Sequence, residues 1–206
     1  VWATSRKLAL EAGWAGAALV PGDGSFEQSG FHFAGRRRSA VDFFPLHNRL
    51  VESSFNGRYP RRLYDAGRPF LVDHPLGAAL MVRGHALEQV GGFDERFFMY
   101  CEEIDLCRRL WQAGWQIYTL PASKIVHLVG QSTGQFREQM FVALWRSRFL
   151  MFEKHESAAF GRAARLLVRL GLGAEARRAR AAHRRGEISA GDLQRRLAAY
   201  DEEAAL

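Results

Sequence analysis

The sequence predicts an α/β domain over residues 1–156, followed by a basic helical tail over residues 157–206. In the first part, short apolar runs bounded by glycine and proline alternate with helix-like segments, which is the pattern of an α/β fold. From Ser157 to Arg185 the composition changes, because this stretch holds many arginines and a single acidic residue, Glu175. The hydrophobic fraction of 48% is ordinary for a globular protein, so the chain has enough apolar material for a core.

The N-terminal elements are read from turn signals and from short apolar runs. A helix is expected to end at Gly13, a buried strand to follow over residues 15–20, and a turn over 21–25. Residues 26–33 predict a short extended piece. Residues 41–69 have little regular period and several aromatics, glycines and prolines, which predicts a long irregular connection.

From residue 70 onward, strand and helix patterns follow each other closely. Buried strands are expected within residues 70–82, where the small residues Gly77 and Ala78 would let a ligand or another backbone approach. A short helix over 84–90 is followed by the pair Gly91-Gly92. The remaining expected elements are a helix over 102–113, strands over 115–120 and 124–127, a helix over 135–155, and further helices with breaks near 171–173 and 186.

Charge and cysteine content narrow the class of protein. The net charge of +7 and pI near 10 favour polyanionic partners, namely nucleic acid, anionic lipid or phosphorylated small molecules. The two cysteines, Cys101 and Cys107, form neither a disulfide framework nor a zinc spacing, which fits a reducing compartment. No apolar run approaches the roughly 18 residues that a membrane span needs. Because the chain starts with Val1, we expect a fragment of a longer protein.

Three carboxylates, Glu102, Glu103 and Asp105, crowd the start of the helix expected from residue 102. Helical spacing puts Glu103 on one face with an apolar row, Leu106, Cys107 and Leu110. Glu103 then lies at the edge of the buried face, where burial raises its pKa and the helix dipole lowers it. Such a carboxylate could take a proton from a hydroxyl.

The alternative is that these acids only favour the helix start and form salt bridges. Asp105 and Arg109 are spaced i, i+4 and can pair. His127 ends a β-branched run before a glycine loop, which places it at a strand end, a common location for ligands in α/β folds. Taken alone, however, this histidine is more often structural than a metal ligand. No glycine-rich phosphate-binding fingerprint is present.

Several blocks of residues together resemble the C-terminal half of a family-2 glycosyltransferase, in its rhamnosyltransferase-like branch. They are LGAALMVR over residues 76–83, VGGFDERFF over 90–98, EEIDLCRR over 102–109, residues 114–121, and His127. Their order and spacing match the family. The resemblance extends over about residues 15–155.

The resemblance implies a partial GT-A fold, a Rossmann-like nucleotide-sugar-binding sandwich, and an inverting reaction that uses a divalent metal, Mg²⁺ or Mn²⁺. The acid pair of the family falls on Glu102-Glu103, which makes Glu103 the implied base, with Glu where the family more often has Asp. Because a glutamate side chain is one methylene longer than an aspartate side chain, Glu102 and Asp105 also stay candidates for the base. His127 matches a position that completes the metal site in some members, and Gly77, Ala78 and Asp94 match segments that line the sugar and acceptor cleft.

The implied partners are a nucleotide-sugar donor and a lipid-linked or polysaccharide acceptor of the bacterial cell envelope, with rhamnose as an example of the sugar. The donor-binding strands and the Asp-x-Asp metal motif of the family's N-terminal half are not found in residues 1–206, so the chain alone is expected to be inactive.

The basic tail predicts an amphipathic helix with apolar positions at Phe160, Ala164, Leu167 and Leu170. Such a helix is typical of membrane-surface binding, which fits a cytoplasmic protein at the inner face of the plasma membrane. The alternative is a helix packed on the domain. A second hypothesis for the whole chain is an incomplete transferase relic that binds a membrane or a partner. Nucleic-acid binding is not expected, because the stretch lacks interleaved aromatics and any known reader module.

Overall fold

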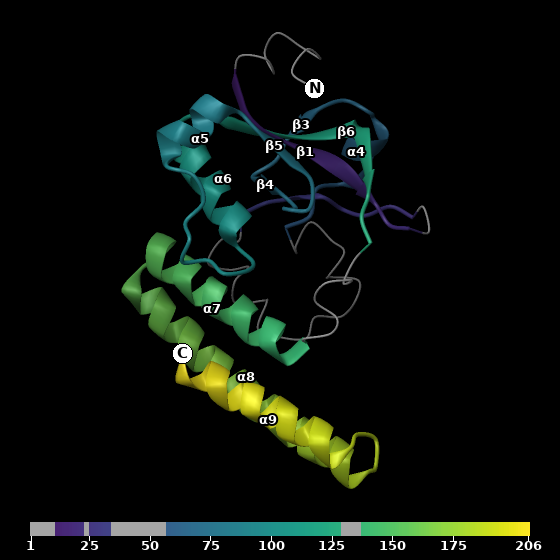
Figure 1. The fold of residues 1–206 in the computed structure, drawn as a ribbon, viewed down its shortest axis with the longest axis vertical. Coiled ribbons are helices and arrows are strands. Elements are labelled where there is room, and N and C mark those ends of the chain that lie inside the picture. Colours follow the sequence, from purple (N-terminus) through teal and green to yellow (C-terminus); the bar gives the residue numbers. More distant parts are fainter. Residues whose placement is uncertain (1–10, 23–24, 34–56, 129–136) are drawn as a thin grey trace. The chain divides into compact units, whose positions relative to one another are not determined.

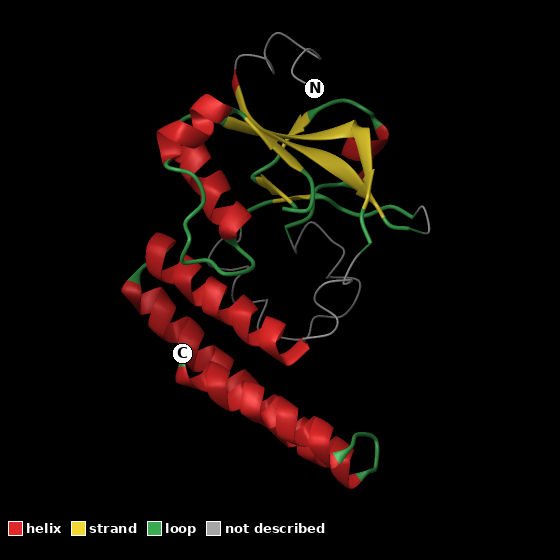
Figure 2. Cartoon of the chain, in the orientation of Figure 1, coloured by secondary structure: helices red, strands yellow, loops and turns green. Residues whose placement is uncertain are grey.

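The computed structural model describes residues 11–22, 25–33, 57–128 and 137–206 (Figure 1). The helix predicted up to Gly13 and the first part of the irregular connection, residues 41–56, lie mostly outside these ranges. The chain divides into two units. One comprises residues 1–38, 46–95 and 102–129 and contains the strands. The other comprises residues 39–45, 96–101 and 130–206 and contains only helices and turns in its described part (Figure 2).

The α/β unit is built on a four-stranded sheet in the order β3-β6-β1-β5. Its centre is β1 (Ala12–Val20), which pairs in parallel with β6 (Gln116–Val126). The edge strands β5 (Leu80–Val82) and β3 (Phe70–Leu71) are antiparallel to β1 and β6 respectively. This mixed sheet with helices confirms the predicted α/β class.

Strand β1 is buried almost throughout, and its residues are mostly small and apolar. A strand that is covered on both faces reads as a continuous apolar run and not as an alternating one. The two strands expected over 115–120 and 124–127 form the single strand β6, with an irregularity where its pairing partner passes from Ala17 to Ala18. Pro121, which has no N–H to donate, lies in this irregular stretch.

A second, two-stranded sheet pairs β2 (Gly30–Phe31) with β4 (His74–Pro75). The short helix α4 (Arg61–Asp65) lies within the region expected to be irregular. The extended pieces are shorter than predicted, since residues 26–33 give only β2, and residues 76–79 form a turn before β5.

Helices α5 (Gly84–Val90) and α6 (Glu102–Gln112) lie side by side next to the sheet (Figure 1). Their apolar faces meet the sheet in one core, which contains Ala86, Leu106, Cys107 and Leu110 from the helices and Trp14, Val72 and Ile117 from the strand side, all of them fully buried. Gly91 ends α5 with a φ of +79°, a left-handed conformation that glycine adopts without a steric penalty. The core therefore fixes where α6 begins, and with it the three acids of its first turn.

The helical unit contains α7 (Arg137–His155), α8 (Ala158–Arg184) and α9 (Ala190–Ala205). Its core joins Trp145 and Phe149 of α7 to Val168 and Leu172 of α8. The predicted break at residues 171–173 is wrong, because α8 continues through both glycines. A glycine costs about 1 kcal/mol in a helix, and the packing of Val168 and Leu172 on either side outweighs this cost.

The helical unit begins before the boundary predicted at residue 156, since α7 shares its core with α8. The predicted break at Gly186 is present, with a φ of +75° at that residue. In the described ranges, none of the helices combines the length and apolar character that a bilayer span requires. Cys101 and Cys107 are both buried, and neither forms a disulfide bond.

Candidate functional site

The first turn of α6 carries Glu102, Glu103 and Asp105, as the sequence predicted. The two residues before it, Tyr100 and Cys101, have φ angles of +66° and +65°. Left-handed conformations cost non-glycine residues on the order of 1–2 kcal/mol each and tend to occur at functional sites. The helix is therefore entered through a strained turn that sets the direction of its first residues.

Asp105 is fully buried and forms the predicted ion pair with Arg109, whose Nε donates to Oδ2 at 2.8 Å. Arg109 also donates through Nη1 to the carbonyl oxygen of Val90 at 2.6 Å. Asp105 thus fastens α6 to the end of α5. A carboxylate held in this way serves the structure, which makes Asp105 the least suitable of the three as a base.

Glu103 lies beside the apolar row of α6, and Leu106, Cys107 and Leu110 are fully buried as expected. Burial raises the pKa of Glu103 to about 7, with a further contribution from the negative charge of Glu102. Hydrogen bonds from the backbone N–H groups of Glu103 and Ile104 act in the opposite direction. Burial therefore outweighs the helix N-terminus, and the carboxyl group is close to half ionised at neutral pH.

Gly77 lies directly against Glu103. A Cβ atom placed on Gly77 would be 3.5 Å from Cβ and Cγ of Glu103 and 3.6 Å from its Cδ. Because glycine has no side chain, Gly77 itself places no side chain between this turn and Glu103. Two of the predicted site residues, far apart in sequence, are thus brought together.

The other predicted residues lie near this pair in the chain. Ala78 is exposed in the same turn, and Asp94 is partly buried in the connection between α5 and α6. Glu102 is partly buried, and among the described residues its Oε2 atom has no hydrogen-bond partner. The roles predicted for Ala78 and Asp94 in substrate binding stay predictions.

His127 follows the last residue of β6, and its backbone N–H donates to the carbonyl oxygen of Val20 at 2.9 Å. Its Nδ1 atom is 3.0 Å from Oε2 of Glu27, and both side chains are partly buried. Glu27 was not predicted as a site residue. It precedes His127 by 100 positions, so no local spacing reveals the pair, although the parallel pairing of β1 with β6 brings the ends of these two strands together.

Comparison with known proteins identifies relatives over part of the chain. An N-acetylglucosaminyl-diphospho-decaprenol L-rhamnosyltransferase of Mycobacterium tuberculosis is 38% identical over 96 residues, which are 47% of this chain and 31% of the relative. The rhamnosyltransferase WbbL of Escherichia coli is 38% identical over 71 residues, 34% of this chain and 27% of the relative. The predicted resemblance to rhamnosyltransferases is confirmed.

A third relative, the low-salt glycan biosynthesis hexosyltransferase Agl10 of Haloferax volcanii, is 34% identical over 80 residues, 38% of this chain and 26% of the relative. No protein-family model matches the chain. The chain spans less than a third of the length of each of these relatives. What the comparisons show is a rhamnosyltransferase-like segment.

A divalent metal with His127 as a ligand was predicted from the sequence, and it stays a prediction. Within residues 11–22, 25–33, 57–128 and 137–206 there is no group of three His, Cys, Asp or Glu side chains that could hold a metal ion. The pair of His127 and Glu27 offers one imidazole and one carboxylate, fewer ligands than Mg²⁺ or Mn²⁺ takes. The described residues do not by themselves make a metal site.

Proposed function

We propose that this chain is part of an inverting glycosyltransferase of GT-A fold. The enzyme would transfer a sugar such as rhamnose from a nucleotide-sugar to a lipid-linked or polysaccharide acceptor in cell-envelope glycan synthesis. The observation that carries the proposal is Glu103, a carboxyl group with a pKa of about 7 next to the bare backbone of Gly77. The names of the relatives, which include two rhamnosyltransferases and a hexosyltransferase, support the reaction class.

In this reaction Glu103 acts as the general base. Its carboxylate takes the proton of the acceptor hydroxyl while the hydroxyl oxygen forms a bond to the anomeric carbon of the sugar. The bond from that carbon to the diphosphate breaks on the opposite face, so the configuration inverts and the nucleoside diphosphate leaves with the electron pair. A base with a pKa near the operating pH combines a useful ionised fraction with sufficient strength.

The negative charge on the leaving diphosphate needs to be neutralised. The family resemblance implies a Mg²⁺ or Mn²⁺ ion for this purpose, which would act as a Lewis acid. His127 remains a predicted ligand, and further ligands would have to come from outside the described residues.

The test is Glu103→Gln in the full-length protein that carries this chain. Glutamine keeps the size and the hydrogen-bonding capacity but cannot accept the proton, so turnover should fall about 10²- to 10⁴-fold. Binding of the nucleotide-sugar, measured by calorimetry, should change little. Glu95→Gln is the matched control, because Glu95 is exposed and lies in the same unit. Turnover retained in the Glu103 variant would place the base elsewhere.

A second function, docking at an anionic membrane surface, is favoured by one face of α8. Exposed residues recur there at helical spacing, and the leucines Leu166 and Leu170 are 60% and 63% exposed. The exposed basic residues of this face are Arg162, Arg169, Arg177, Arg180 and Arg184. Basic residues with interspersed leucines are what a helix at an anionic lipid surface needs.

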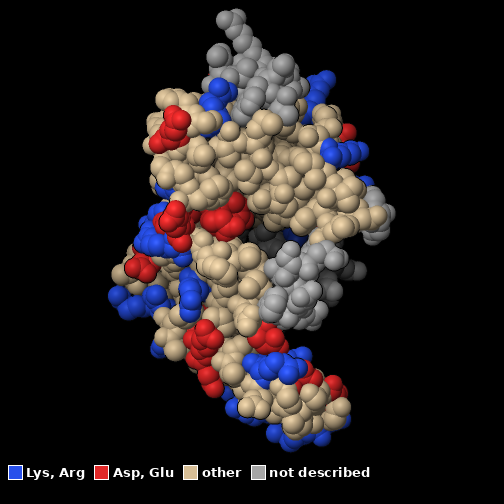
Figure 3. All heavy atoms as spheres, viewed as in Figure 1, with Lys and Arg blue, Asp and Glu red and all other residues tan. Residues whose placement is uncertain are grey.

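Of the apolar positions expected from the sequence, this face includes Leu170 but neither Phe160 nor Ala164. Ala164 is buried in the helical unit, and Phe160 packs edge-on against Phe152 at 5.1 Å, so both belong to the packed side of α8. Figure 3 shows acidic as well as basic side chains over the helical unit, so the unit is not basic throughout. A peripheral position at the inner face of the membrane therefore depends on the exposed basic face of α8.

Sedimentation of the full chain with lipid vesicles tests this second function. Binding to vesicles rich in phosphatidylglycerol, lost with phosphatidylcholine alone, is the expected result. The double variant Arg177→Gln, Arg180→Gln should weaken it, whereas Arg68→Gln, which removes an exposed charge from the other unit, should not. If binding did not depend on anionic lipid, the membrane function would be excluded.

A further inference from the structure

A hollow of about 600 Å³ lies on the α/β unit, and none of its described lining residues belongs to α6. It is lined by Phe26, Gln28, Arg58, Tyr59, Pro60, Arg61 and Arg62. None of the described lining residues is acidic, and three of them are arginines. The volume is within the roughly 300–1,000 Å³ that is typical of ligand sites. We refer to it as the arginine pocket.

The backbone at Arg58 is fixed by pairing with β2 and the residue that follows it. Arg58 forms a bridge with Phe31 of β2, and the preceding carbonyl oxygen, that of Gly57, accepts a hydrogen bond from His32 N–H at 2.7 Å. Its guanidinium donates through Nη1 to Oε1 of Gln28 at a long distance, 3.4 Å, and lies over the ring of Phe31, with Cζ 5.9 Å from the ring centre. Its Nε is buried and has no acceptor among the residues that the structure describes. Leaving a buried charged donor without an acceptor is costly, so Arg58 has capacity to bind an anion.

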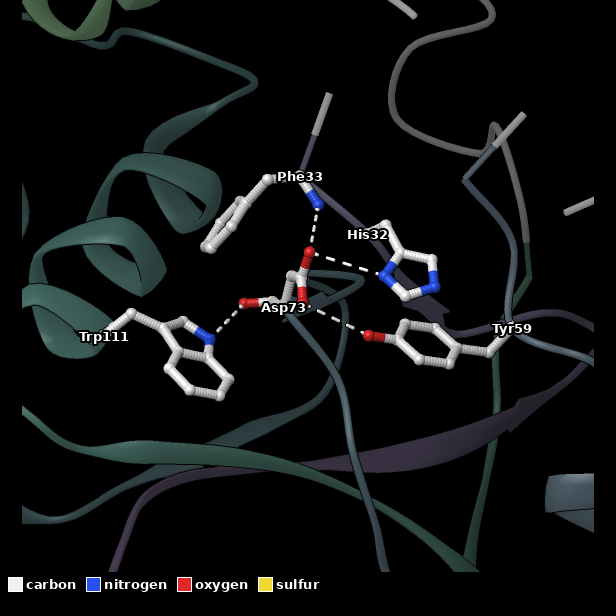
Figure 4. A network of polar contacts seen from close by, with 5 residues as sticks. All are labelled: His32, Phe33, Tyr59, Asp73 and Trp111. Carbon is white, nitrogen blue, oxygen red and sulfur yellow. Dashed lines mark hydrogen bonds and ion pairs between the residues drawn. The ribbon is translucent and has the colours of Figure 1, made fainter. Parts of the chain in front are cut away.

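The segment next to Arg58 is fixed by a network around Asp73 (Figure 4). Tyr59 donates its hydroxyl to Oδ1 of Asp73 at 3.2 Å, and its ring stacks on His32 at 3.9 Å. Oδ2 of Asp73 accepts from the backbone N–H of Phe33 at 2.7 Å and lies 3.5 Å from Nδ1 of His32. The carboxylate of Asp73 thus contacts Tyr59, Phe33 and His32, and it fixes the position of Tyr59 in the pocket lining.

Another part of the lining comes from the start of α4. Arg61 lies over the ring of Phe26, with its Cζ 5.2 Å from the ring centre, and its ion pair with Asp65 is long, 3.7 Å, and highly exposed. Such a pair contributes little and is easily exchanged. Arg62 is exposed, and no interaction of its side chain is present among the described residues. Phe26 packs edge-on against Tyr64 at 4.9 Å, which fixes the apolar side of the pocket.

We propose that the arginine pocket binds a diphosphate group. Guanidinium groups form bidentate hydrogen bonds with phosphate oxygens, and this geometry favours phosphate over small spherical anions. Three arginines with no acidic lining residue match the two to three negative charges of a diphosphate. The walls are fixed before binding, which lowers the entropy cost of holding the ligand. Phe26 offers an apolar surface to whatever the diphosphate is attached to.

The diphosphate could belong to a free nucleotide or to a lipid. The choice between these two sources rests on the proposed function, in which a nucleoside diphosphate leaves and the acceptor can be lipid-linked. Binding of the diphosphate itself does not depend on that proposal. If Glu103→Gln kept its turnover while the pocket bound diphosphate, the transferase mechanism would fail and the pocket would stand.

The test is isothermal titration of the full chain with inorganic pyrophosphate at low salt. We expect saturable binding that weakens by at least about tenfold in Arg58→Gln and in Arg62→Gln, since a charge-assisted hydrogen bond contributes about 1.5–3 kcal/mol. Arg68→Gln is the control, because Arg68 is exposed in the same unit and does not line the pocket. Arg62 is exposed, so its variant should fold even if the Arg58 variant does not.

Two outcomes would overturn the proposal. One is the absence of saturable binding. The other is equal weakening by Arg68→Gln, which would mean attraction to diffuse positive charge and no defined site. Titrations with uridine diphosphate and with farnesyl diphosphate in detergent then separate the sources. Tighter binding of the nucleotide supports a donor or product site, and tighter binding of the lipid supports an acceptor site.

Discussion

Glu103, partly buried in the α/β unit, and Glu203, fully buried in the helical unit, are glutamates whose pKa values are raised, to about 7 and about 8. Burial is the main cause in both, and a neighbouring glutamate contributes in both. Their surroundings differ. Glu103 begins a helix, where backbone N–H groups stabilise its ionised form, and it contacts Gly77. Glu203 is in the last turn of α9, where the helix dipole opposes a negative charge.

The carboxyl oxygens of Glu203 are both buried and have no hydrogen-bond partner among the described residues. The core of the helical unit is apolar and aromatic, with Trp145, Phe149 and Tyr200 among its members. A raised pKa is therefore not enough to mark a catalytic group. At Glu103 it occurs together with a bare backbone beside the carboxyl group, and at Glu203 it reflects only a carboxyl group enclosed in a core.

The largest expected effect is on the stability of the helical unit. The folded pKa of Glu203 is about 8 and its ordinary value is 4.5, so above about pH 4.5 the unfolded state releases the proton first. The stability of the unit should fall as pH rises from about 4.5 to 8, by several kcal/mol at 1.36 kcal/mol per pKa unit. Glu203→Gln should remove this pH dependence, as measured by urea unfolding followed by circular dichroism at about pH 5 and pH 8.

The control for Glu203→Gln is Glu202→Gln, since Glu202 is exposed and its ion pair with Arg146 is long, 3.7 Å. This variant should keep most of the pH dependence of the wild type, because Glu202 contributes less than burial to the raised pKa of Glu203. Turnover of the full-length protein should be unaffected by Glu203→Gln, in contrast to Glu103→Gln. A loss of turnover in the Glu203 variant without a loss of folded protein would contradict the distinction between the two glutamates.

The parts of the fold that sequence could predict are those with local signals. The helix over residues 84–90 and the start of the helix at Glu102 were predicted from glycine turns and apolar spacing, and both agree with the structure. The break expected at residues 171–173 failed because the glycines of α8 are supported by packing against α7, which the local sequence does not reveal. Likewise, pairing with β1 keeps β6 continuous across Pro121.

The same distinction holds for the candidate sites. The edge position of Glu103 and the pairing of Asp105 with Arg109 follow from helical spacing, and both were predicted. The partnership of Glu27 with His127 and the bridge of Arg58 with Phe31 join distant segments, so no spacing rule could find them. The burial of Glu203 also lacked a signal, because its neighbours in sequence are acids and alanines.

A smaller effect is expected from Glu102→Gln. Removing the neighbouring negative charge should lower the pKa of Glu103, while the larger contribution, that of burial, stays in place. Carboxyl-carbon NMR titration of the full chain measures this directly. In the full-length protein, the acid limb of the pH–rate profile should move to lower pH. An unchanged or higher pKa would mean that Glu102 is not the charge that acts on Glu103.

The smallest effect is expected from Gly77→Ala, which tests whether solvent reaches Glu103 past that glycine. The new Cβ would be in ordinary van der Waals contact with Glu103, and Gly77 is not among the glycines with positive φ, so the unfolding free energy should change by less than about 1 kcal/mol. The pKa of Glu103 should rise slightly, because the methyl group adds to the burial of the carboxyl group. Gly84→Ala is the control, since a Cβ there would meet nothing within 4 Å. If both variants left the NMR-measured pKa of Glu103 unchanged, the backbone at Gly77 would not control access to the carboxyl group, and the contact with Gly77 would not distinguish Glu103 from Glu203.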